Sequence, residues 1–444
     1  MSFTEWRKFD AVENSLIASH LDHTLDRVRK SFVEHMETLQ RPDVKRHVLE
    51  LSILDSCDGS LYGYPNISED PEKSQAFFAP IYRAVSSTLP HLTSLRTLKL
   101  FSWKISLDVL NRIARLPRLH TLVIYNCTSS VRSPTSVRLP KIPSIRNLQF
   151  HFSEETQVDS WIFLAMCPKV EKLSVTTPRH TDTWQTSSAF PNFGIAYVYP
   201  FWKLRKWLIS YIHSEFIEVI SSWILDRIHL LPRGRLPLTH LKIKIEDSIS
   251  SDMISELLHA LGYTSLKSLV LIGIHYTEPE LLDRIAQTLP NLLELTLFYR
   301  KSHIFEDEDD GDDLSELINW TQHAVDYVSH FASFKALQYF SWNNKHPGFS
   351  FLPLSMGFFE AERFPLLFTD VEDCCDEGQV VAKAIWAQCP SLEYMVYESR
   401  LPEHLYRRVE NDGTVSFRDF RDFRVGDCQL VRQRNPSWDW DIPY

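Results

Sequence analysis

The chain has 444 residues, more than one compact core of ordinary proportions holds, which leaves several domains or one elongated array of repeats. Lys and Arg number 47 against 57 Asp and Glu, and the formal net charge of −10 argues against a dedicated nucleic-acid-binding protein, which needs a basic face. Only 12 residues are glycine, so phosphate-cradling loops and nucleophile elbows, which need glycine at sharp turns, are disfavoured.

The N-terminal residues MSFTEWRKFD carry charges where a secretory signal has its apolar segment. The longest uncharged stretch, residues 184–202, contains two prolines and several polar residues, so it is no clean membrane helix. The seven cysteines include no Cys-x-x-Cys pair, which disfavours both a disulfide framework and a zinc site. We therefore expect a cytoplasmic or nuclear protein with no membrane segment, no metal and no cofactor.

Residues 1–43 are predicted to be a helical N-terminal cap. Within them, residues 11–40 have the apolar spacing of one or two amphipathic helices. Such helices either cover the end of the array that follows or form a separate helical module.

From residue 44 onward one pattern recurs: an apolar residue, two spacers, a second apolar residue, one spacer and a third apolar residue. The copy Leu95-Leu98-Leu100 is a clear example, and regular copies follow one another every 24 to 28 residues, within or near the period of leucine-rich repeats. Eleven copies begin at Val48, Leu95, Leu119, Ile145, Val170, Leu204, Leu238, Leu266, Leu292, Phe334 and Leu392.

The segments between these copies have the apolar spacing of helices, as in residues 106–116 and 277–289. A proline in the lead-in to the next copy, such as Pro117, ends the preceding helix. One strand and one helix per repeat, each burying its apolar face only against its neighbours, predict an α/β leucine-rich-repeat solenoid. Parallel strands are expected on its concave face and helices on its convex face.

The phrases RPDVKRHVLELSI (41–53) and LPRLHTLVIYNC (116–127) resemble the helix-containing repeats of the ribonuclease-inhibitor type. They are most similar to fungal, basidiomycete-type F-box-associated leucine-rich-repeat proteins, over roughly residues 41–410. The resemblance implies a protein-binding scaffold that serves as the substrate-recognition subunit of a ubiquitin ligase.

The chain departs from this family in two ways. The family's Asn or Cys, three residues after the third apolar position, is matched only by Cys127, so we expect an irregular stack. No F-box start of the Leu-Pro-x-Glu kind is present near the N-terminus. Residues 11–40 are therefore either a cap or the remnant of a diverged F-box.

The solenoid is predicted to cover residues 44–400, with acidic insertions at 306–313 and 370–377 that we interpret as solvated loops. Two aromatic-rich insertions, 184–202 and 349–359, interrupt long repeats. They either pack as satellite cores or act as recognition surfaces.

Residues 401–444 are predicted to be a C-terminal hairpin and cap. The turn residues Asn411, Asp412 and Gly413 lie between two extended runs, a strong hairpin signal. Such a hairpin would cover the edge of the last strand.

The concave face is the predicted partner-binding surface, because strand alternation turns the residues that flank the apolar positions away from the stack. Early and middle repeats place polar and basic side chains there, and later repeats place apolar ones. The predicted site residues are Lys99, Tyr125, Lys172, Lys206, Lys242, Lys244, Val270, Ile272, Phe298 and Phe340. The apolar group is an exposed partner site, a core covered by an insertion, or a misassigned strand register.

No motif singles out a catalytic residue or a metal ligand, since neither H-E-x-x-H nor G-x-S-x-G occurs. The sequence therefore predicts a non-enzymatic scaffold for protein–protein interaction. Its partner is expected to be a protein, without membrane association and with nucleic acid disfavoured. The alternatives are a hydrolase or transferase on an atypical α/β scaffold, and RNA or phosphate-ligand binding through the concave lysines.

Overall fold

The structure is a computed structural model, and it divides into two compact units, residues 1–204 and 205–444. The residues that it describes are 18–54, 71–129, 139–151, 162–176, 202–212, 214–228, 234–275, 277–299, 320, 322, 324–343, 377–397, 404–411 and 414–419. Most of each predicted insertion lies outside these residues: 306–313 and 370–376 of the acidic ones, 184–201 and 349–359 of the aromatic ones.

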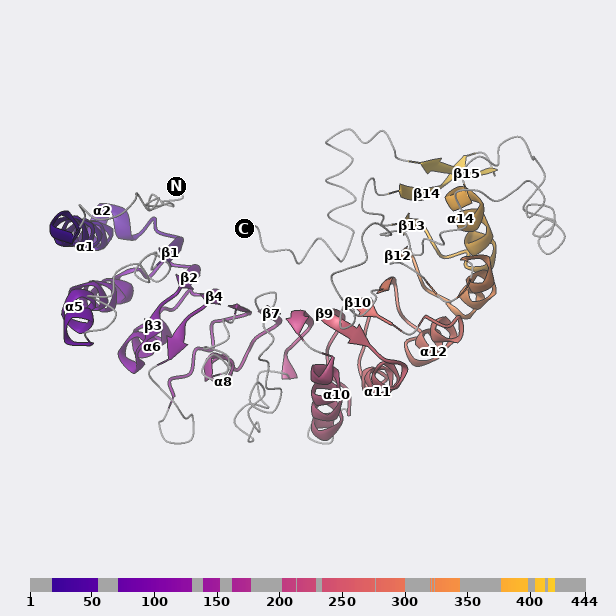
Figure 1. Ribbon diagram of the computed structural model, residues 1–444, viewed down its shortest axis with the longest axis horizontal. Coiled ribbons are helices and arrows are strands. Elements are labelled where there is room, and N and C mark those ends of the chain that lie inside the picture. Colours follow the sequence, from indigo (N-terminus) through magenta and orange to yellow (C-terminus); the bar gives the residue numbers. More distant parts are fainter. Residues whose placement is uncertain are drawn as a thin grey trace. The chain divides into compact units, whose positions relative to one another are not determined.

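The first unit is a parallel sheet whose connecting helices lie on one side of the strands (Figure 1). Its strands pair in parallel and in register, in the order β1 (Glu50–Leu54), β2 (Thr97–Phe101), β4 (Thr121–Tyr125), β6 (Asn147–His151) and β7 (Lys172–Thr176). The helices are α1 (Ala18–Gln40), α2 (Pro42–Lys45), α5 (Pro71–Thr88), α6 (Leu107–Ala114), α8 (Ile162–Met166) and the 3₁₀ turn η2 (Leu89–His91). Two short strands, β3 (Lys104–Ile105) and β5 (Thr128–Ser129), form a separate pair.

The second unit repeats the same arrangement. Its parallel strands are β8 (Lys206–Ile212), β9 (His240–Ile249), β10 (Ser268–Ile274), β11 (Glu294–Tyr299), β12 (Tyr339–Trp342) and β13 (Tyr394–Tyr397). The helices α10 (Glu215–Ile228), α11 (Ser251–Leu261), α12 (Glu280–Thr288), η7 (Ala324–Ser333) and α14 (Glu377–Gln388) pack one against the next. The strands β14 (His404–Asn411) and β15 (Thr414–Asp419) form an antiparallel hairpin on either side of the predicted turn, and β14 also pairs antiparallel with β13.

The repeated apolar residues form the core between the strands and the helices. Leu98 pairs with Leu122 and Leu122 with Leu148, and all three are fully buried. On the helix side, Ser106 caps α6 by accepting from Val109 N, and α6 buries Val109, Leu110 and Ile113. One strand and one helix per repeat, stacked in parallel, make a leucine-rich-repeat solenoid, so the predicted fold class is confirmed.

A ladder of backbone carbonyls joins the repeats at the amino ends of their strands. The carbonyl of Arg96 accepts two bonds from the next repeat, from His120 N at 2.8 Å and from Thr121 N at 3.0 Å. The same pair of bonds recurs at Leu49, His120, Arg146, Arg205, Thr239, Lys267, Leu293 and Gln338. We call this set of bonds the carbonyl ladder. Within each unit it fixes each strand against the next, whatever the length of the loop between them.

Two turns after strands of the first unit adopt left-handed backbone without glycine. Ser102 and Asn126 have φ of 57° and 50°, and their amides donate to Tyr125 O and His151 O at 2.7 Å. Just beyond, the buried Sγ of Cys127 accepts from Trp103 N at 3.4 Å. Cys127 thus bonds the turn of the preceding repeat from the position where the resembling family has Asn or Cys.

The helix α1 extends the helical layer of the first unit. Its Met36 is buried, and Gln40 Nε2 donates to Thr88 Oγ1 of α5 at 2.9 Å. The same hydroxyl donates to Ala84 O and lies within hydrogen-bonding distance of Met36 O. The two helices are therefore joined by a polar contact at the C-terminal end of each.

The predicted outward position of Phe340 is wrong. Phe340 pairs with Leu295 and Met395, both core positions, and it is fully buried. The chain offers two overlapping matches to the repeat pattern here, and the true copy is Leu337-Phe340-Trp342. Phe334 occupies the lead-in position instead, so the predicted copy was displaced by three residues.

This register predicts that replacing Phe340 destabilises the fold much more than replacing Phe298. Replacing Phe340 by Ala empties a fully buried site beside Phe331 and Trp342, whose ring centroids lie 4.8 and 5.2 Å away, and should cost about 3–5 kcal/mol. Phe298→Ala, at a half-buried outward position, should cost about 1 kcal/mol. Chemical denaturation of the full chain measures both, and equal losses would contradict the register.

Candidate functional site

The outward face is the side of each sheet that points away from the helices. In each repeat it is formed by the residues on either side of the second core residue and by the residue after the third core residue. In β2 the core residues are Leu98 and Leu100, and the outward residues are Thr97, Lys99 and Phe101. In the first unit these positions align across β2, β4 and β6 because the strands pair residue by residue. Sequence-predicted site residues fall on this face in both units.

In the first unit, three rings stack along the carboxyl ends of the strands. Phe101, Tyr125 and His151 are consecutive partners in the register. The ring centroids of Phe101 and Tyr125 lie 5.6 Å apart, and those of Tyr125 and His151 lie 4.9 Å apart. We call these three side chains the aromatic row. Leu54, the partner of Phe101 on β1, continues it and is 48% exposed.

His151 is an uncharged member of the row at neutral pH. Burial lowers the pKa of its imidazole from an ordinary value of 6.5 to about 4, because the low-dielectric surroundings disfavour the charged form. The aromatic row is therefore an apolar surface under physiological conditions.

Polar groups border the aromatic row. Lys99 Nζ lies 2.7 Å from Glu50 Oε1, and both side chains are partly exposed. Gln149 is half-buried on β6, and Lys172 is exposed at the start of β7. Of the predicted site residues, the structure thus brings Lys99 and Tyr125 close to each other on adjacent strands.

The outward face of the second unit is largely buried. Lys242 is 4% exposed and its neighbour Val270 is 1% exposed. Lys206, Lys244, Ile272 and Phe298 are half-buried, and Ile272 pairs directly with Phe298. Val270 therefore lies on the predicted face but belongs to a covered core rather than to an exposed partner site.

Two hydroxyls in this covered row have no hydrogen-bond partner among the described residues. Thr296 and Ser341 are partners on β11 and β12, and each is fully buried. Neither Thr296 Oγ1 nor Ser341 Oγ is satisfied, whereas the buried hydroxyl of Thr264 donates to Leu261 O at 2.7 Å. Neither residue is predictable from the sequence as part of a site, because a lone Thr or Ser between core positions is an ordinary outward residue.

Phe101 is not among the predicted site residues, although its position in the repeat indicates that it belongs there. It follows the third apolar residue of its repeat, as Tyr125 does in the next repeat. Strand pairing then brings the two rings together, and this contact depends on the register between repeats.

The described part of the chain offers little reactive chemistry. Within it, no group of three or more His, Cys, Asp or Glu side chains is placed to hold a metal ion. Cys127, Cys167 and Cys389 are buried and not in disulfides, and burial raises the pKa of Cys167 and Cys389, which keeps both protonated at neutral pH. No helix among the described residues is long and apolar enough to cross a membrane.

Comparison with known proteins finds no matching family model and no matching curated protein. Among solved structures, the chain is similar to a chain from the crystal structure of a TLR13–ssRNA13 complex, with 14% sequence identity and a TM-score of 0.27. The match covers 59% of this chain and 38% of that chain.

The unpaired hydroxyl of Thr296 leads to a stability prediction. Thr296→Val replaces a buried, unsatisfied hydroxyl by a methyl group of similar size and should stabilise the fold by about 1 kcal/mol. The matched control Thr264→Val removes a hydroxyl that makes a hydrogen bond and should destabilise by about 1–2 kcal/mol. Urea denaturation distinguishes the two, and a loss of stability in Thr296→Val similar to that in the control would show that Thr296 has a partner.

The lowered pKa of His151 leads to a pH prediction. Between about pH 6.5 and pH 4 the unfolded chain binds a proton on this imidazole that the native state does not. Stability is therefore fully present above pH 6.5 and falls with the pH towards 4, by no more than about 3 kcal/mol. His151→Phe should flatten this part of the curve when free energies of unfolding are compared at pH 7 and pH 4.5. If stability depended on pH in the same way in both proteins, the lowered pKa of His151 would not be the cause of the pH dependence.

Proposed function

We propose that the protein is a binding scaffold that engages a protein partner through the outward face of its first unit. The observation that carries this proposal is the aromatic row. Three rings lie in register on three adjacent strands, half-buried among their neighbours, with the exposed Leu54 at one end. Aromatic side chains dominate the binding energy of protein interfaces.

The row is held rigidly, which favours binding. Phe101, Tyr125 and His151 each end a strand, and the backbone beyond the first two is fixed by the left-handed turns at Ser102 and Asn126. Rings that are already ordered lose little conformational entropy when a partner binds.

The surroundings of the row have the composition of an interface. An apolar centre is bordered by the Lys99–Glu50 ion pair, by Gln149 and by the exposed Lys172. Protein interfaces commonly have a desolvated centre and a polar, solvated rim. The rim charges would contribute to specificity and association rate more than to affinity.

The finer proposal is that this scaffold is the substrate-recognition subunit of a ubiquitin ligase. Its support is the sequence resemblance of residues 41–53 and 116–127 to F-box-associated repeats. In such an assembly the aromatic row would hold the substrate, and the ligase core would attach elsewhere on the chain.

RNA binding through the predicted lysines receives less support. Lys242 is 4% exposed, and Lys99 forms an ion pair with Glu50. These lysines therefore do not line up as an open basic face, which a phosphate backbone requires.

The described residues include a His–Asp–Ser cluster, in which Asp283 lies 2.6 Å from His330 Nδ1 and accepts from Ser333 Oγ at 2.6 Å. Ser333 bonds to Asp283 rather than to His330, so the cluster does not have the nucleophile–base pair of a hydrolase.

Removing the central ring of the row tests the proposed function. Partners recovered from cell extract with the wild-type protein are identified, and their dissociation constants are measured with purified variants. Tyr125→Ala should weaken the partner at least 10-fold, in the range of about 1.5–3 kcal/mol expected for an interface hot spot.

The matched control is Tyr263→Ala, which removes a tyrosine that is 40% exposed in the second unit. It should leave the dissociation constant unchanged. Equal constants for the wild type and Tyr125→Ala would overturn the site. Recovery of ligase components that persists in Tyr125→Ala supports the finer proposal, and recovery of a partner without any ligase component contradicts it.

A further inference from the structure

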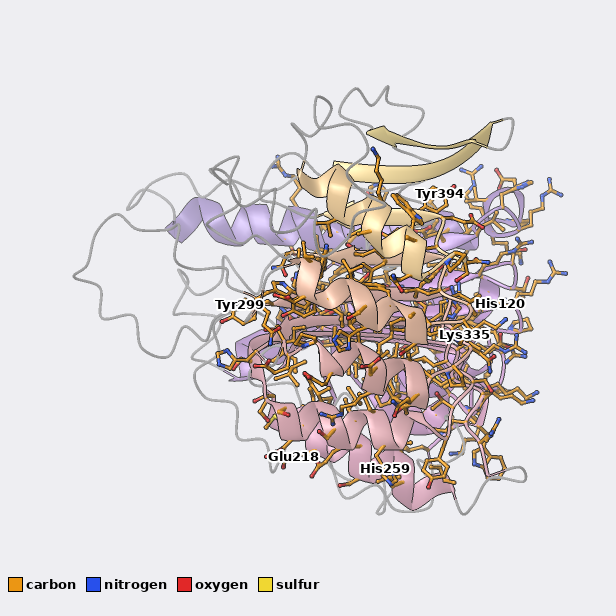
Figure 2. All side chains as sticks on the ribbon, turned by 90° about the vertical axis from the view of Figure 1, so that its right-hand side faces the viewer. His120, Glu218, His259, Tyr299, Lys335 and Tyr394 are labelled. Atoms are coloured by element: carbon orange, nitrogen blue, oxygen red, sulfur yellow. The ribbon has the colours of Figure 1, made fainter. Side chains whose placement is uncertain are left out.

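A dense strip of basic side chains lies at the opposite ends of the same strands. It occupies the described loops that enter β2, β4, β6 and β7 in the first unit. We call it the basic edge, and it consists of Arg96, Arg115, Arg118, Lys141, Arg146 and Lys169. Nitrogen-tipped side chains gather along the edge where His120 is labelled (Figure 2).

These side chains are accessible to a partner. All except Arg146 are exposed, and the side chain of Arg146 is 35% exposed. In the described residues of these loops, Glu171 is the one acidic side chain. The described loops that enter the strands of the second unit hold Lys203, Arg205, Arg235, Lys267 and Lys335, spread over more strands. The first unit therefore has the stronger positive potential at this edge.

The carbonyl ladder positions the basic edge. Arg96 and Arg146 are themselves residues whose carbonyls accept the paired bonds from the next repeat, so the backbone under each guanidinium is fixed. Arg146 is held further by Nη1, which donates to Pro143 O at 2.9 Å. Neighbouring strands lie about 4.8 Å apart, so a basic group recurs at short intervals along the edge. An extended partner with closely spaced negative charges matches this spacing.

The chemistry of the strip favours carboxylates over nucleic acid. Arg146 Nε already lies 3.3 Å from Glu171 Oε1, which shows a guanidinium of the strip paired with a carboxylate. Among the described residues of these loops there is no Phe, Tyr or Trp, and the aromatic rings are the imidazoles of His91 and His120. The loops therefore offer few of the aromatic platforms on which bases stack.

We propose that the basic edge binds an acidic segment, a run of Asp and Glu residues, in a partner protein. Arginine pairs with carboxylates through two parallel hydrogen bonds, and four of the six side chains are arginine. The aromatic row lies at the other end of strands five residues long, about 16 Å away. The two surfaces are therefore separate, and this inference does not depend on the proposed function.

The test uses the full chain and a fluorescently labelled decapeptide of alternating Asp and Glu, with fluorescence anisotropy as the readout. The wild type should bind it with an affinity that falls as salt is added. Arg118→Glu/Lys169→Glu should weaken binding at least 10-fold. The matched control Arg235→Glu/Lys267→Glu, with the same change in net charge in the second unit, should weaken it less than 3-fold.

Each other outcome overturns the proposal. No binding to the wild type excludes an acidic-segment site, and equal losses in both double variants indicate general attraction rather than a site. A single-stranded oligouridylate that binds more tightly than the peptide, and is lost in Arg118→Glu/Lys169→Glu, would assign the strip to nucleic acid. Tyr125→Ala should retain the peptide, so failure of the aromatic row and failure of the basic edge are distinguishable.

Discussion

The carbonyl ladder is the interaction on which the rest of the structure depends. One backbone carbonyl before each strand accepts two amides from the next repeat, for example Arg96 from His120 and Thr121. Because the ladder uses only backbone atoms, repeats with very different insertions can stack in the same register. Side chains at equivalent positions of successive repeats then align across the strands. This alignment builds the aromatic row at the carboxyl ends of the strands of the first unit and the basic edge at their amino ends.

The two units share the same strand register but differ in how deeply their outward faces are buried. In the first unit β2 reads TLKLF, with polar residues alternating with core leucines, and its outward residues remain partly exposed. In the second unit β10 reads SLVLIGI and is buried on both faces. A near-continuous apolar strand is typical of a parallel sheet covered on both sides. The outward face therefore remains more accessible in the first unit, whereas in the second unit half-buried apolar residues such as Ile272 and Phe298 are confined to the carboxyl ends of the strands.

The local apolar pattern predicted most of the fold. Copies such as Leu95-Leu98-Leu100 and Leu266-Leu269-Leu271 lie at core positions, because a strand with one helix-covered face must bury alternate residues. The pattern failed where it matched twice, at Phe334 and at Leu337, since a single sequence cannot decide which copy pairs with Leu292.

The candidate site was only partly predictable, because it depends on contacts between repeats. Tyr125 was predicted, but its stacking on Phe101 and His151 arises from strand pairing. The burial of Val270 left a signal in the apolar run of β10, whereas the burial of Lys242 left none, since lysine is ordinarily exposed. The basic edge leaves no signal in the apolar repeat pattern, because its side chains belong to the loops that precede the strands.

In the proposed function, the outward face of the first unit, rather than its helical face, contacts the partner. Photo-crosslinking tests this directly, with a benzophenone amino acid placed at Gln149 beside the aromatic row or at Asn111 on the exposed surface of α6. A crosslinked partner is expected at position 149 and none at position 111. Crosslinking at 111 with none at 149 would contradict the proposed function.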